Sequence, residues 1–135
     1  MSPPVAKQGL LLFAHGARDP NWAVPFESVA GIIRQQRPGL PVELVFLEFM
    51  GPTVTQAGQR LAALGCTQVA VVPLFLGAGG HVRKDLPALL ADLAQAHPDV
   101  AWQLQPAVGE IDSVITAMAQ AALALAESPS PSDPK

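Results

Sequence analysis

The sequence predicts a small doubly wound α/β domain, that is, a parallel sheet with helices on both faces. Short apolar runs alternate four times with longer segments in which apolar residues recur at helical spacing. Strict alternation of this kind is typical of parallel strands joined by right-handed helical crossovers. The first run, residues 9–14, is also continuously apolar, as expected for a strand that is covered on both sides. We therefore predict a four-stranded sheet in the order 2-1-3-4.

The first half of the chain contains two strand–helix units. Residues 9–14 are all apolar or glycine and form the first predicted strand. Asp19 followed by Pro20 is a typical helix start, and the helix is expected to end near Arg37, before a Pro-Gly pair. Residues 41–47 form the second strand, which places Glu48 at its carboxyl end.

The second half repeats this organisation. A helix is expected from Pro52 and Thr53 to Gly65, where a left-handed residue ends it. Residues 68–74 form a third strand, and a helix over about residues 83–96 follows a glycine-rich loop. Residues 100–104 alternate in polarity, which indicates a strand nearer an edge. The last helix is amphipathic, with a stripe formed by Ile111, Val114, Ile115, Met118, Ala122 and Leu125.

Length and composition limit the domain organisation and the partners. The 135 residues suffice for one domain, which we place at residues 9–126, between an extension at 1–8 and a disordered Pro/Ser tail at 127–135. Half of the residues are apolar, so self-association is expected. The formal net charge is −3 and there is no long basic run, which excludes a typical nucleic-acid-binding surface.

The sequence also indicates the compartment. Cys66 is the only cysteine, which excludes an internal disulfide and any cysteine cluster within one chain, and we expect it to be buried. No apolar stretch reaches the ~20 residues of a membrane-spanning helix, and the first residues lack an apolar signal core. We therefore expect no membrane contact and a cytoplasmic location.

Three residues with metal-binding side chains are predicted to meet at one edge of the sheet. With the order 2-1-3-4 the switch point, where ligands bind in such sheets, lies between the first and third strands. His15 and His81 follow these two strands, and Glu48 follows the second. Two imidazoles with a nearby carboxylate suit cobalt, iron, nickel or zinc. His97 ends a helix before a proline, where a histidine caps free carbonyls, and we exclude it from the site.

The loops around the two histidines suggest contacts with a larger ligand. The glycine-rich loop Gly77-Ala78-Gly79-Gly80 lets backbone approach a large flat molecule, although a flexible turn and a phosphate cradle are alternatives. A group of cations flanks both histidines and suits a substrate with several carboxylates. These cations are Arg18, Arg83 and Lys84.

Three segments resemble the short, single-domain CbiX-type sirohydrochlorin chelatases of the class II chelatase superfamily. They cover residues 11–20, 46–48 and 71–87, and the most specific is Gly-Gly-His-Val-x-x-Asp-Leu-Pro, which contains His81. The resemblance implies insertion of a divalent metal into sirohydrochlorin for cobalamin or sirohaem synthesis, with Co²⁺ favoured and Fe²⁺ an alternative. It also implies that His15 and His81 bind the incoming metal, that Glu48 lies near them, and that the protein is a homodimer. Ala17 departs from the serine that relatives often have there.

The proposed chemistry agrees with the residues. Metal insertion exchanges two pyrrole protons for the ion, so it needs weak ligands, a base and a shaped cavity, but no cofactor beyond the substrate metal. His15 is the preferred base, and Glu48 would orient a histidine or relay protons. Other interpretations of the sequence remain open: a nickel chelatase, a carrier that binds a metal or tetrapyrrole without turnover, and a nucleotide-binding module that uses the glycine-rich loop.

Overall fold

A four-stranded parallel sheet forms the centre of the computed structural model, which describes residues 6–77 and 80–128, with the backbone alone at 80–84. The strand order is β2-β1-β3-β4, which confirms the predicted topology. The elements, in chain order, are β1 (Gln8–Ala14), η1 (Pro20–Ala23), α1 (Val24–Gln36), β2 (Val42–Phe46), α2 (Val54–Ala63), β3 (Gln68–Pro73), α3 (Gly80–Ala96), β4 (Ala101–Leu104), η2 (Val108–Glu110) and α4 (Asp112–Glu127). The ends predicted to be an extension and a tail lie largely outside the described residues.

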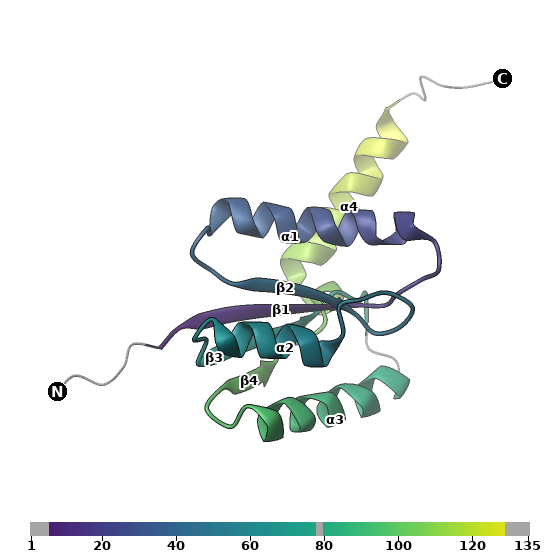
Figure 1. The fold of residues 1–135 in the computed structure, drawn as a ribbon. Coiled ribbons are helices and arrows are strands. Elements are labelled where there is room, and N and C mark those ends of the chain that lie inside the picture. The colour runs from purple at the N-terminus through teal and green to yellow at the C-terminus, as the bar shows by residue number, and fades with distance from the viewer. Residues whose placement is uncertain (1–5, 78–79, 129–135) are drawn as a thin grey trace.

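The helices lie in two layers on either side of the sheet (Figure 1). Leu11 and Phe13 of β1 are fully buried on the side of α2 and α3, together with Leu61 and other residues of the larger core. Leu12 points to the opposite side, where a smaller cluster includes Ala30 of α1. Because alternate residues of β1 enter different cores, residues 9–14 of the strand are all apolar or glycine, as predicted.

Several helix boundaries differ from the predictions for local reasons. Asp19 caps a short 3-10 helix by accepting a hydrogen bond from the Asn21 N–H at 2.9 Å, so α1 itself begins only at Val24. The third helix begins at Gly80, three residues before the predicted start. α4 also begins after a 3-10 turn, η2, that periodicity did not reveal. Gly65 has the predicted left-handed conformation, with φ of +88°.

The structure confirms two further predictions, the edge position of β4 and the burial of Cys66. β4 is an edge strand, and three of its four residues are exposed. Cys66 is 3% exposed, and burial raises the pKa of its thiol although the nearby Lys7 charge acts in the opposite direction. None of the described helices is both long and apolar enough to span a bilayer.

The start of α2 gives a first testable prediction. Thr53 and Gln56 form a capping box, in which the Thr53 side chain accepts from the Gln56 N–H at 3.1 Å and the Gln56 side chain accepts from the Thr53 N–H at 3.0 Å. Replacing Thr53 with alanine should lower the free energy of unfolding by about 1 kcal/mol, measured by urea denaturation. Thr55→Ala, at the second residue of α2, is the control and should change stability much less. Equal losses in the two variants would contradict a capping role.

Candidate functional site

The candidate site begins where β1 and β2 end at the carboxyl edge of the sheet. The Leu47 N–H donates to the Ala14 carbonyl at 2.9 Å and extends the β1–β2 pairing by one residue. Beyond it, the Gly16 N–H donates to Glu48 Oε1 at 2.8 Å. The two loops approach so closely that a Cβ on Gly16 would lie 1.6 Å from the Glu48 carbonyl oxygen. Only glycine fits this contact, which holds the Glu48 carboxylate against the loop that carries His15.

The His15 imidazole is held on two sides. Its Nδ1 lies 3.5 Å from Glu48 Oε1, and its ring stacks on Phe75 with 4.6 Å between the centroids. The Trp22 indole N–H donates to the His15 carbonyl and fixes the backbone of the loop. The side chains of His15 and Glu48 are 49% and 43% exposed, so both are oriented and yet open to a ligand. Phe75, which follows β3, joins the ends of the first and third strands as the switch-point prediction required.

A cavity of about 430 Å³ lies beside this pair. The loops contribute His15, Leu47 and Glu48, and α3 contributes the remaining lining residues, namely Asp85, Ala88, Leu89 and Asp92. Sequence reasoning missed the two aspartates as lining residues. Their spacing with Ala88 and Leu89 places them on one helical face, and that signal was present in the sequence. The wall of this cavity thus carries three carboxylates and one imidazole, which makes it attractive to cations.

The structure places some predicted residues and leaves others untested. His81, Arg83 and Lys84 belong to the first turns of α3, whose backbone starts at the same edge of the sheet, but their side chains lie outside the described residues. Ala78 and Gly79 are also outside them, and Gly80 is the first residue of α3. Within the part of the chain that is described, no three side chains of histidine, cysteine, aspartate or glutamate are close enough together to hold an ion. The predicted pairing of His15 with His81 therefore stays a prediction.

The remaining predicted residues lie outside the cavity lining. The Arg18 guanidinium carbon lies 5.1 Å from the centre of the Phe49 ring, and Phe49 itself is 65% exposed with a left-handed φ of 67°. Gly77 is exposed, with open space around the position of a Cβ. The backbone N–H of His97 donates to the Leu93 carbonyl at the end of α3, and capping of free carbonyls by the His97 imidazole stays a prediction.

The open parallel sheet defines a protein of the doubly wound α/β class, in which a cavity with an imidazole and carboxylates at the carboxyl edge is a candidate ligand site. Comparison with known families makes this class specific. The chain belongs to the CbiX family, whose model matches residues 9–124. The match includes β1 from its second residue onward, the cavity and α3, and it covers the three segments that carry the resemblance.

Curated relatives and solved structures agree with this assignment. The chain is 34% identical over 85 residues to a sirohydrochlorin cobaltochelatase of Methanosarcina acetivorans, a match that covers 63% of this chain and 65% of the relative. The chain is also 36% identical over 84 residues to the sirohydrochlorin cobaltochelatase of Methanothermobacter thermautotrophicus. That match covers 62% of this chain and 58% of the relative. The chain thus spans less than two thirds of the length of these two relatives.

The fold is shared with two solved chelatase-like proteins. A putative cobalamin biosynthesis CbiX protein from Marinobacter aquaeolei superposes with a TM-score of 0.79 at 29% identity, over 89% of this chain and 98% of that one. The sirohydrochlorin chelatase SirB from Bacillus subtilis, solved in complex with cobalt, gives a TM-score of 0.76 at 25% identity, over 89% of this chain and 51% of SirB. This chain therefore corresponds to one half of a SirB-sized molecule.

Proposed function

We propose that this protein is a metal chelatase that inserts a divalent ion, Co²⁺ first and Fe²⁺ as the alternative, into sirohydrochlorin. The observation that carries the proposal is the oriented His15–Glu48 pair, 3.5 Å apart, on the wall of an open cavity at the switch point of a CbiX-family sheet. The names of the relatives supply the substrate and the preferred metal. The ion is a substrate here, so a site that releases it is required.

The geometry supports a defined role for each member of the pair. Nδ1 of His15 faces Glu48, which favours the tautomer that carries its hydrogen on Nδ1 and leaves the Nε2 lone pair for the ion or for a pyrrole proton. The balanced reaction replaces two pyrrole N–H protons by one M²⁺ and releases both protons. In the proposal His15 is the preferred base for one of them, and Glu48 orients His15 or relays a proton. His81 would be the second metal ligand.

The substrate contacts and the assembly are also proposals. Arg18, Arg83 and Lys84 would bind the peripheral carboxylates of the tetrapyrrole, and the loop from Gly77 to Gly80 would let the flat ring approach the backbone. The protein would act as a homodimer, which is supported by its correspondence to half of SirB. A cytoplasmic location stays a prediction from the sequence.

The test is an anaerobic absorbance assay of sirohydrochlorin with Co²⁺, Fe²⁺ or Ni²⁺. Several turnovers per protein chain, faster than the uncatalysed reaction, are expected with Co²⁺. Turnover with Ni²⁺ alone would replace the proposal by a nickel chelatase. A single stoichiometric spectral change without turnover would instead identify a carrier protein, and no acceleration with any ion would refute the enzyme.

Glu48→Gln separates orientation from charge. The glutamine retains a carbonyl oxygen that can accept from the Gly16 N–H, but it loses the negative charge beside His15 Nδ1. Loss of such an orienting carboxylate typically costs about 10- to 100-fold in affinity or activity, so we expect kcat/KM for cobalt insertion to fall by about tenfold or more. Glu43→Gln, on β2 and paired with Arg60, is the charge-matched control. A wild-type rate in Glu48→Gln would remove Glu48 from the mechanism.

A further inference from the structure

α4 is an amphipathic helix whose apolar side lacks a partner among the described residues of its own chain. None of its sixteen residues, Asp112 to Glu127, is buried. Ile115 is 46% exposed, Met118 42% and Leu125 78%, although all three belong to one stripe of the helix. Its packing is against η2, and Figure 1 shows it rising away from the sheet beyond the α1 layer. The only charged residues of the helix are its first and last, so nothing in the stripe favours exposure to water.

A second apolar surface is open on the α1 side of the sheet. Two helices, α2 and α3, pack on the other side, whereas α1 covers this side over β1 and β2. We call the uncovered region the open strip: Val29 and Ile32 of α1, which are 39% and 53% exposed, and Ala70 and Val72 of β3, which are half-buried. A doubly wound fold covers both sides of its sheet with helices, so the open strip is where the fourth helix is expected to pack.

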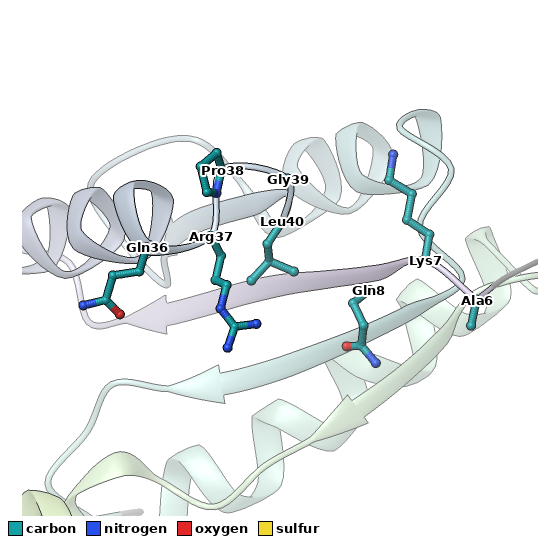
Figure 2. Close-up of a pocket in the computed structure, with 8 residues that line it drawn as sticks. All are labelled: Ala6, Lys7, Gln8, Gln36, Arg37, Pro38, Gly39 and Leu40. Atoms are coloured by element: carbon teal, nitrogen blue, oxygen red, sulfur yellow. The ribbon is translucent and has the colours of Figure 1, made fainter.

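The orientation of α1 places Val29 and Ile32 beside β3. The Arg34 guanidinium donates to the Val42 carbonyl at 2.8 Å, so the flank of α1 that carries Arg34 faces β2. Because each residue of an α-helix is rotated by about 100° from the one before it, Val29 and Ile32 lie on the flank of α1 opposite to Arg34. Figure 2 looks onto this side: a hollow of about 630 Å³ lies between the end of α1 and the sheet, and Gln8, Gln36 and Arg37 line it. This hollow lies at the amino edge of the sheet, on the same side as the open strip.

The start of α4 directs the helix away from the open strip of its own chain. The Gly109 N–H donates to the Phe75 carbonyl at 2.9 Å, and Gly109 packs so closely that a Cβ there would lie 2.0 Å from the Leu76 carbonyl oxygen. Ile111, with φ of −89° and ψ of 131°, then turns the chain into α4. Because η2 is anchored at this edge, folding back onto the same sheet requires the turn at Ile111 to be rebuilt.

We propose that α4 is exchanged between two copies of this chain, so that the apolar stripe of each α4 covers the open strip of the other copy. The two surfaces match in chemistry, since the α4 stripe and the open strip are both apolar and uncharged. They also match in length, because a 16-residue helix is about 24 Å long and a six-residue strand about 20 Å. A two-fold axis makes the contact twice, as a closed dimer requires.

Sedimentation velocity of three glutamate variants tests the exchange. The wild type is expected to be a dimer at micromolar concentration, and both Met118→Glu in α4 and Ile32→Glu in the open strip are expected to be monomers. Gln120→Glu, on the polar side of α4, introduces the same charge and should remain dimeric. The substituted side chains are exposed in the single chain, so the variants should stay folded by circular dichroism. A monomeric wild type, or a dimeric Ile32→Glu, would overturn the proposal.

A disulfide test distinguishes exchange from folding back. In an Ile32→Cys, Met118→Cys double variant, oxidation is expected to link two chains on a non-reducing gel, and Gln120→Cys in place of Met118→Cys should not form that link. A disulfide closed within one chain would show that α4 covers its own sheet and would overturn the exchange. The inference rests on the homodimer of the proposed function but not on its chemistry. Because neither experiment measures turnover, failure of the exchange and failure of the chelatase assay are separate results.

Discussion

His15→Ala is expected to reduce kcat/KM for cobalt insertion into sirohydrochlorin by about 100-fold or more. The substitution removes the imidazole that Glu48 and Phe75 orient on the cavity wall, and with it the proposed ligand and base. A positioned general base alone contributes about 10²- to 10⁴-fold to a rate. The side chain is half exposed, so its removal should leave the fold and the thermal midpoint nearly unchanged. This variant should therefore lose activity while keeping its stability.

His97→Ala is the matched control for this experiment. His97 lies at the far end of α3, where its ring is 6.0 Å from that of Trp102, and it does not line the cavity. It should retain wild-type turnover, which would exclude a general effect of losing a histidine. His81→Ala tests the proposed second ligand in the same assay, and a loss comparable with that of His15→Ala is expected. Full activity in His15→Ala would remove the central residue of the proposal.

Gly16→Ala is expected to damage the site through the backbone. A Cβ at this position would lie 1.6 Å from the Glu48 carbonyl oxygen, whereas real contacts of this kind are longer than 3.0 Å, so the two loops must separate by more than 1 Å. Misplacement of reacting groups by that amount can cost about 100-fold in rate. Overpacking of this kind also typically costs about 1–3 kcal/mol of stability. We therefore expect both turnover and the thermal midpoint to fall.

Gly39→Ala provides the comparison for Gly16→Ala. Gly39 follows α1 at the opposite edge of the sheet, and an added Cβ there meets nothing within 4 Å. Its effect on turnover should be negligible and its effect on stability small. If Gly16→Ala retained wild-type activity and stability, the close approach of the two loops would have no functional importance.

The organisation of the sheet and the position of the site could be predicted because each depends on local signals. The short, mainly apolar runs identify the strands, and the alternation with helices leaves few topologies. Once the strand order is known, residues that end the strands must meet at one edge, which is why His15 and Glu48 were expected to be neighbours. The capping box at Thr53 and the left-handed Gly65 are likewise consequences of short sequence patterns.

Other features arise from contacts between segments that are distant in the sequence, and no local pattern reports them. The role of Gly16 depends on the approach of the Glu48 carbonyl from another loop, and Asp92 reaches the cavity only because α3 crosses beside the ends of β1 and β2. The sequence determined by itself that α4 is amphipathic, since that property follows from spacing along one helix. Only the tertiary structure decided that its apolar stripe stays uncovered within the described part of the chain, because the direction of a helix depends on how the residues before it pack.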